Sequence, residues 1–188
     1  MKTDIAATAG SSVLGGAIQG RELFEQLATL GRDRQAMPTP WWWDFGSVEV
    51  VSASFIRESF VSVRALLRAQ RSTLAPVVVN ANPDVREDLH VGFAAAHDTI
   101  LIGTVDTAGS LSGLDLIGEL DPHLRTTFRL VAERGETDAK ELKELTDAQP
   151  GSSPIVQTAW NNRLAKLAEL GALIEIPRGR AKRYRLIV

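Results

Sequence analysis

Two hydrophobic patterns alternate along the first 105 residues of the chain. Strand-like runs, which are apolar or rich in aromatic and β-branched side chains, occupy residues 3–9, 40–51, 75–79 and 99–105. Apolar residues recur at roughly helical spacing in residues 20–30, 52–70 and 83–98. Because single helices separate these strands, we expect an α/β domain with a mixed sheet, at least part of it parallel.

The second part of the chain has a different order. Three helical patterns, at residues 122–135, 137–147 and 154–170, precede two strand-like runs at residues 172–176 and 183–188. Helix, helix, helix and hairpin is the order of a winged helix-turn-helix domain. The expected helix N-caps are Asn82 in the first part and Asp121, Thr137 and Ser153 in the second.

A weakly periodic segment rich in small residues lies between the two parts, at residues 106–122. Such a composition favours a linker, which we place at residues 111–120. We therefore expect an α/β domain at residues 1–110 and a winged helix-turn-helix domain at residues 121–188.

Charge also separates the two parts. The chain of 188 residues has a formal net charge of −2, yet residues 1–120 hold nine Lys and Arg against fourteen Asp and Glu, a net −5. Residues 121–188 hold twelve against nine, a net +3, and residues 153–188 alone hold seven basic and two acidic residues. A cationic surplus at one end of a chain indicates an anionic partner there.

The chain lacks the residues that several classes of function require. The chain has no cysteine, which removes disulfides, thiolate metal sites and cysteine nucleophiles. Residues 10–15 have the glycine spacing of a phosphate-binding loop, but Gly16 and Ala17 stand where Lys and Ser or Thr are needed. No nucleophile and base can be paired, so we expect no enzyme, no cofactor and no metal. No apolar run approaches the ~18 residues of a membrane span and no signal peptide is evident, so we expect a cytoplasmic protein without a membrane partner.

The third helix of the second part has a polar, nearly uncharged face. Its core-facing stripe comprises Val156, Trp160, Leu164, Leu167 and Leu170. The opposite face and its flanks carry Gln157, Thr158, Asn161, Asn162 and Lys166. Amide and hydroxyl side chains of this kind reach base edges in the major groove. By itself, the pattern is equally consistent with an ordinary amphipathic helix.

The hairpin at the end of the chain favours DNA binding over an ordinary amphipathic helix. Five cations lie close together at its tip and on its last strand: Arg178, Arg180, Lys182, Arg183 and Arg185. Alternation places Tyr184, Leu186 and Val188 on a packed face, with Arg183, Arg185 and Ile187 on the other. A charged edge strand also discourages aggregation, but one or two charges suffice for that. We therefore expect double-stranded DNA as the partner, with these cations against its phosphates.

Residues 121–188 resemble the winged-helix domains of bacterial regulators. The resemblance rests on TAWNNRLAKLAELGAL followed by IEIPRGRAKRYRLIV. It implies a recognition helix in the major groove and a wing on the adjacent backbone.

The string WWDFGSVEVVSASFIRESF is similar to the STAS-like domain family of uncharacterised bacterial proteins, over about residues 3–105. The resemblance implies candidate switch or interaction residues at Asp44, Ser52, Ser54 and Glu58. The related anti-sigma-factor antagonists carry a phosphorylated serine at this turn, where this chain has Ala53. The simpler alternative is helix capping, with Ser54 as N-cap and Glu58 facing the positive end of the helix.

Two hypotheses follow. In the first, the chain is a bacterial DNA-binding protein, a transcriptional regulator whose winged helix holds an operator while the STAS-like half senses or recruits. In the alternative, the chain is a partner-switching protein like the anti-sigma-factor antagonists, and its winged helix docks protein. Both hypotheses leave open whether the chain forms a homodimer and whether the STAS-like half binds a protein partner. The sequence identifies neither the operator nor the direction of regulation.

Overall fold

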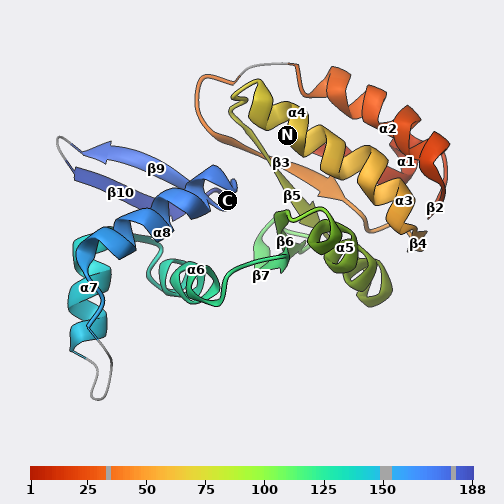
Figure 1. The fold of residues 1–188 in the computed structure, drawn as a ribbon. Helices are drawn as coiled ribbons and strands as arrows, with labels where there is room; N and C mark the ends of the chain where they lie inside the picture. Colours follow the sequence, from red (N-terminus) through yellow and green to blue (C-terminus); the bar gives the residue numbers. More distant parts are fainter. Residues whose placement is uncertain (33–34, 149–153, 179–180) are drawn as a thin grey trace. The chain divides into compact units, whose positions relative to one another are not determined.

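The computed structural model describes residues 1–32, 35–148, 154–178 and 181–188, which form two compact units. Unit 1 comprises Met1–Glu119 together with Val188, and unit 2 comprises Leu120–Ile187 (Figure 1). Each unit has its own set of buried apolar side chains.

Unit 1 alternates strands and helices along the chain. Its elements are β1 Lys2–Asp4, α1 Ile5–Ala9, β2 Val13–Leu14, α2 Ala17–Leu30, β3 Thr39–Asp44, β4 Val50–Val51, α3 Ala53–Ile56, the π-helix η1 Arg57–Val61, α4 Ser62–Ala69, β5 Leu74–Val79, α5 Pro83–Ala95, β6 Thr99–Val105 and β7 Leu111–Gly118. The segment from α3 through α4 is helical throughout, as the pattern at residues 52–70 predicts. Asn82 caps α5 as expected, because its side chain accepts from the Val85 amide at 2.9 Å.

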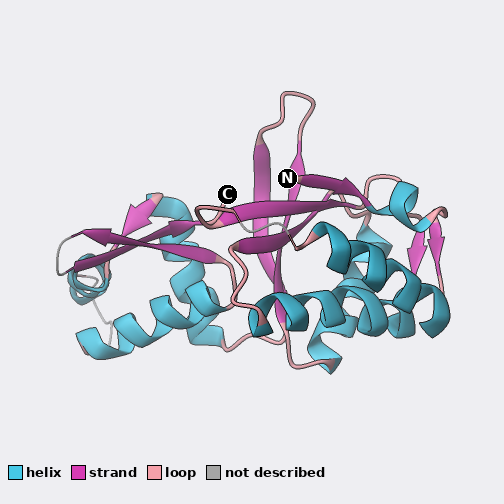
Figure 2. Cartoon of the chain, turned by 90° about the horizontal axis from the view of Figure 1, so that it is seen from above, coloured by secondary structure: helices cyan, strands magenta, loops and turns pink. Residues whose placement is uncertain are grey.

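Five strands of unit 1 form one sheet in the order β1-β3-β5-β6-β7. The first four are parallel, and β7 runs antiparallel to β6. The predicted α/β class with a mixed sheet is therefore confirmed. Each connection between parallel strands leads to the next strand in the same direction along the sheet. Right-handed crossovers therefore place the connecting helices on the same face of the sheet. Figure 2 shows the long helices together on one side of the strands.

Three consecutive tryptophans divide between the two faces of β3. Trp41 and Trp43 are fully buried against the helices, with ring centroids 5.5 Å apart and planes at 78°. Trp41 Nε1 donates to Thr3 Oγ1 at 2.9 Å, which fastens β1 to the core. Trp42 points the opposite way and is half-buried. The alternation of side chains along the strand thus places two of the three indoles in the core that faces the helices.

Residues 111–120 are not a linker. Leu111–Gly118 forms β7, which pairs with β6 from Thr99↔Gly118 to Val105↔Leu111. Its inner half is buried, including Leu116 and Ile117. Glycine and serine obscure the apolar pattern of the outer half, and pairing with β6 is a contact that composition does not reveal. The units therefore divide after Glu119, at the end of this strand.

The first strand-like run is shorter than expected. Only Lys2–Asp4 forms a strand, and residues Ile5–Ala9 form α1. The Asp4 side chain caps this helix by accepting from the Ala7 amide at 2.9 Å. A good cap followed by alanines thus ends the strand after three residues.

Unit 2 has the predicted three helices and hairpin, with one additional strand. Its elements are α6 Pro122–Arg134, β8 Glu136–Thr137, α7 Ala139–Asp147, α8 Gln157–Glu169, β9 Leu173–Arg178 and β10 Ala181–Leu186. The strand that the sequence pattern missed, β8, completes an antiparallel sheet in the order β8-β10-β9. Asp121 caps α6 as expected, but α7 is capped by Asp138 and not by Thr137, which belongs to β8.

Candidate nucleic-acid interface

Helix α8 presents an uncharged polar face to solvent. Its inner side is held by Trp160, Leu164 and Leu167, each 1% exposed or less. The side chains predicted to contact bases are all exposed on the outer side: Gln157, Thr158, Asn161, Asn162 and Lys166. Because the inner side is packed, these side chains project from fixed positions on the helix.

The start of α8 differs from the expectation. The helix begins at Gln157 with Val156 as its N-cap, and no side chain makes a capping hydrogen bond. Val156 is 68% exposed and does not belong to the core stripe. The expected cap, Ser153, lies outside the described residues. Gln157 and Thr158 therefore occupy the first turn, where backbone N–H groups lack helical partners.

Arg163 belongs to the packing of α8. Its guanidinium carbon lies 5.0 Å from the centroid of the Trp160 ring, which is a cation–π arrangement. This contact draws the cation along the helix surface toward the buried indole.

Strands β9 and β10 form the predicted hairpin, with a register from Leu173↔Leu186 to Arg178↔Ala181. Tyr184 is buried as predicted, and Leu186 is half-buried. Ile187 is 5% exposed, although alternation placed it on the cationic face. The strand ends at Leu186, so the alternation does not extend to Ile187.

A carboxylate cluster holds Arg183. Its Nε donates to Glu136 Oε1 at 2.6 Å, and its Nη1 donates to Glu141 Oε1 at 2.8 Å and to Asp138 Oδ2 at 3.5 Å. The hydrogen bonds that Arg183 donates to Glu141 and Glu136 raise the pKa of Arg183, and the bond donated to Glu141 lowers the pKa of Glu141. Arg183 thus ties β10 to β8 and α7. A contact of Arg183 with DNA stays a prediction, and it would compete with these carboxylates.

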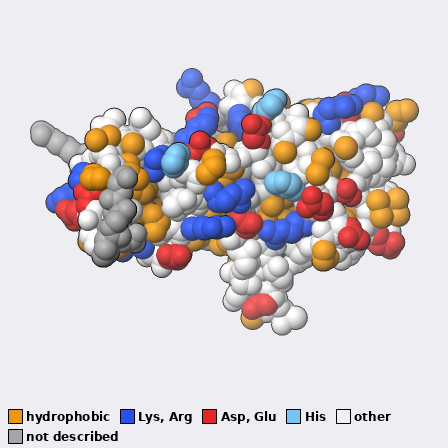
Figure 3. Space-filling view, turned by 60° about the horizontal axis from the view of Figure 1, so that its bottom comes forward, with side chains coloured by type: hydrophobic (Ala, Val, Ile, Leu, Met, Phe, Trp, Pro, Cys, Tyr) orange, Lys and Arg blue, Asp and Glu red, His pale blue; other side chains and the backbone are white. Residues whose placement is uncertain are grey.

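Three other cations at the interface have a carboxylate partner each. The pairs are Lys182–Glu175 at 3.0 Å, Lys166–Glu169 at 3.0 Å and Arg178–Glu136 at 3.6 Å. Within the described part of the hairpin, only Arg185 is exposed with no carboxylate within 4.0 Å. Arg180 lies outside the described residues. On the face drawn in Figure 3, Asp and Glu side chains lie among the Lys and Arg side chains.

The predicted switch serines of unit 1 lie at the start of α3. Ser52 is the N-cap, and not Ser54: its Oγ accepts from the Phe55 amide at 3.3 Å and from the Gly16 amide at 3.1 Å. Ser54 Oγ lies 3.2 Å from Ser52 Oγ. The bond from the Phe55 amide caps α3, whereas the bond from the Gly16 amide joins this turn to the start of α2. Modification of either serine stays a prediction.

Glu58 and Asp44 lie in separate surroundings. Glu58 Oε1 is 3.0 Å from the Arg57 guanidinium. Asp44 lies 2.7 Å from Lys2 Nζ and accepts from Asn80 Nδ2 at 3.0 Å. Burial raises the pKa of Asp44, but these hydrogen bonds outweigh burial and hold it below its ordinary value. The hydrogen bonds of Asp44 therefore join the ends of β1, β3 and β5 and do not reach the serine turn.

A buried ion pair in unit 1 was not predicted. The side chains of Arg64 on α4 and Asp98 before β6 are 4% and 5% exposed, with Nε 2.9 Å from Oδ2. Arg64 Nη2 also donates to the Thr99 carbonyl at 2.5 Å, and Arg68 pairs with the same carboxylate. Burial raises the pKa of Asp98, but the two arginines outweigh burial and lower it. The two ends of this pair are 34 residues apart, so no local pattern reveals it.

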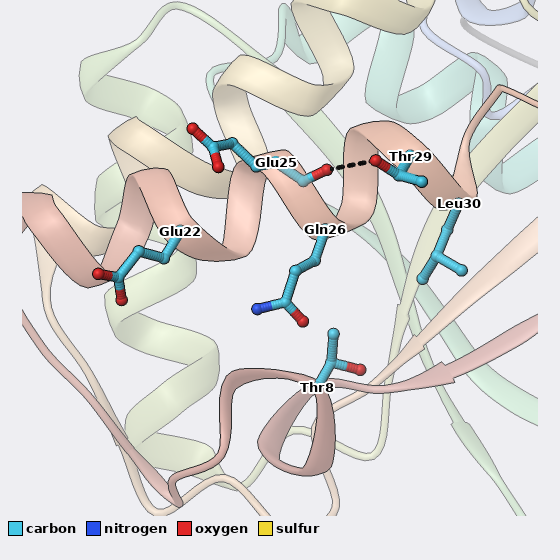
Figure 4. Close-up of a pocket in the computed structure, with 6 residues that line it drawn as sticks. All are labelled: Thr8, Glu22, Glu25, Gln26, Thr29 and Leu30. Carbon is cyan, nitrogen blue, oxygen red and sulfur yellow. Dashed lines mark hydrogen bonds between the residues drawn. The ribbon is translucent and has the colours of Figure 1, made fainter.

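A shallow pocket of about 650 Å³ lies between α1 and α2 (Figure 4). Gln26 and Thr8 point toward each other across it, and its lining also includes Glu22, Glu25, Thr29 and Leu30. The Thr29 hydroxyl donates to the Glu25 carbonyl at 2.9 Å within the helix. The Thr8 hydroxyl likewise donates to a backbone carbonyl, that of Asp4, at 2.6 Å.

No protein-family model matches the chain, and no curated protein matches it. Among solved structures, a chain from a structure of the ESCRT-II endosomal trafficking complex is 12% identical, with 89% of this chain and 88% of that chain covered and a TM-score of 0.33. A likeness at that TM-score supports no argument about fold or function. In the described residues, no helix combines the length and apolarity needed to cross a membrane.

Proposed function

We propose that unit 2 is a winged helix-turn-helix domain that binds double-stranded DNA, and that the chain is a bacterial transcriptional regulator. In this proposal unit 1 is a STAS-like domain that senses a signal or recruits a protein. The observation that carries the proposal is the outer face of α8, where Gln157, Thr158, Asn161 and Asn162 are exposed together on a helix locked by Trp160.

Helix α8 supplies sequence recognition in this proposal. The major groove admits an α-helix, and Asn and Gln amides pair bidentately with adenine N6 and N7. In winged-helix and related domains the N-terminal residues of the recognition helix contact base edges. Gln157, Thr158 and Asn161 lie in the first turns of α8, which matches that geometry.

The hairpin supplies sequence-independent affinity. Arg185 is exposed and has no carboxylate within 4.0 Å in the described residues, so its guanidinium is available to a phosphate. Lys182 and Arg178 reach solvent as well, with side chains 62% and 65% exposed, but each must first leave a carboxylate. We therefore expect Arg185 to contribute more than either.

A duplex-binding titration at several salt concentrations tests the proposal. We expect binding at low salt that weakens as salt is added, because phosphate contacts release counterions. Selection from random duplexes then identifies the preferred sequence. No binding at low salt, or binding insensitive to salt, would show that unit 2 is not a DNA-binding domain.

Replacing Asn161 and Arg185 should have different effects. Asn161→Ala should cost about 1–3 kcal/mol on the selected duplex and relax the preference at one base pair, since a bidentate base contact is lost. Arg185→Ala should weaken all duplexes alike and reduce the salt slope by about one. Fluorescence anisotropy with the selected and scrambled duplexes separates the two. Equal losses on both duplexes for Asn161→Ala would remove α8 from sequence recognition.

A further inference from the structure

A carboxylate stands next to a cation that we expect to meet DNA. Lys182 Nζ lies 3.0 Å from Glu175 Oε1 and 3.1 Å from Oε2, across the hairpin from β10 to β9. Tyr184 donates its hydroxyl to Glu175 Oε2 at 3.2 Å. The lysine and the tyrosine thus share one carboxylate.

The two partners of Glu175 differ in mobility. Tyr184 is 3% exposed, so its ring is fixed in the core and its hydroxyl holds the carboxylate in place. Burial and the neighbouring carboxylate raise the pKa of Tyr184 to about 12, so the hydroxyl remains a donor at neutral pH. Lys182 is 62% exposed on a flexible stem and is free to take another partner. The carboxylate stays while the ammonium can leave.

We propose that Glu175 is an intramolecular competitor of DNA phosphate for Lys182, and that it limits the sequence-independent affinity of unit 2. This inference rests on the proposed DNA binding. Lys182 must leave Glu175 to reach a phosphate, and the uncovered carboxylate then repels that phosphate. Exposed ion pairs are weak enough to exchange partners in this way. Weak phosphate contacts give the base contacts of α8 a larger share of the binding free energy.

The same arrangement recurs on α8, where Lys166 Nζ lies 3.0 Å from Glu169 Oε2. Both side chains are at least half exposed, so this pair is the less firmly held of the two. Cations that we expect to meet DNA are thus paired with carboxylates at two places, Lys166 on the helix and Lys182 on the hairpin.

The test measures binding of the full chain to a random-sequence duplex. Glu175→Gln removes the charge but keeps an oxygen that accepts from Tyr184. We expect its affinity to rise about three- to tenfold at low salt, and the salt slope to steepen by about one phosphate contact. Lys182→Ala added to Glu175→Gln should cancel this gain. Circular dichroism melting of each variant verifies that unit 2 is folded.

Glu133→Gln is the matched control. Glu133 is an exposed carboxylate on α6 with no cation within 4.0 Å among the described residues, so its removal changes the net charge equally but releases no lysine. Equal gains from Glu175→Gln and Glu133→Gln would overturn the competitor role, and so would a gain that survives Lys182→Ala. If the wild-type protein binds DNA and Glu175→Gln leaves its affinity unchanged, only this inference is overturned. Failure of every variant to bind any duplex overturns the proposed function as well.

Discussion

Asp98→Ala is expected to destabilise unit 1 by about 3–5 kcal/mol, because it leaves a buried arginine without its counter-charge. Arg64 is 4% exposed and cannot reach water without disrupting α4, whereas Arg68 is 42% exposed and can. The Asp98 carboxylate also accepts from the Thr99 amide at 2.7 Å at the start of β6. Urea unfolding followed by fluorescence measures the loss, since three of the four tryptophans belong to unit 1.

The double variant Arg64→Met with Asp98→Ala is the control for this prediction. Replacing both members of a buried ion pair by apolar groups removes the unpaired charge, so the double variant should lose less stability than Asp98→Ala alone. If the single variant loses less than about 1 kcal/mol, or if the double variant loses the sum of both single changes, the ion pair does not support the fold in this way.

Acid sensitivity gives a second measurement of the same pair. The pKa of Asp98 is lower in the folded state than its ordinary value, so its contribution is complete above the ordinary carboxyl range near pH 4. The contribution is lost as the pH falls through the folded pKa. Wild-type unit 1 should therefore lose stability below pH 4 more steeply than Asp98→Ala does. Parallel acid profiles for the two proteins would contradict this.

Elements defined by neighbouring residues could be predicted from the sequence, and elements defined by distant contacts could not. The adjacent residues Asn82 and Pro83 together specify the start of α5 at Pro83. The strand β7 depends on pairing with β6 across a turn rich in small residues, so it resembles a linker. The strand β8 has two residues and exists because β10 lies beside it. The pattern of neighbouring residues contains no information about pairing with a distant strand.

The candidate site divides in the same way. The burial of Trp160, Leu164 and Leu167 follows from helical spacing, and the exposed amides follow with it. The availability of the hairpin cations does not follow from alternation. Glu136 and Glu141 come 47 and 42 residues before Arg183 in the sequence, and only the folded sheet brings them into contact with it. A count of cations therefore overstates the unpaired positive charge that the hairpin exposes to solvent.

Trp160→Ala should unfold most of unit 2 and abolish duplex binding. Trp160 is 1% exposed and is the largest fully buried side chain of this unit, and truncating a buried tryptophan costs about 3–5 kcal/mol. Arg163 also loses the ring over which it lies. Domains as small as unit 2, Leu120–Ile187, rarely have more than about 3–5 kcal/mol of stability, so little folded unit 2 should remain.

Asn161→Ala, at the next residue of α8, is the control because Asn161 is exposed. It should leave stability within about 0.5 kcal/mol of the wild type while changing sequence preference. Far-UV circular dichroism reports the loss of unit 2 in Trp160→Ala, and the tryptophan fluorescence of that variant comes from unit 1 alone, which has its own core. Retained helicity together with lost binding would mean that Trp160 acts at the DNA surface, which its burial argues against. Lost helicity with retained binding would place the DNA contact outside unit 2.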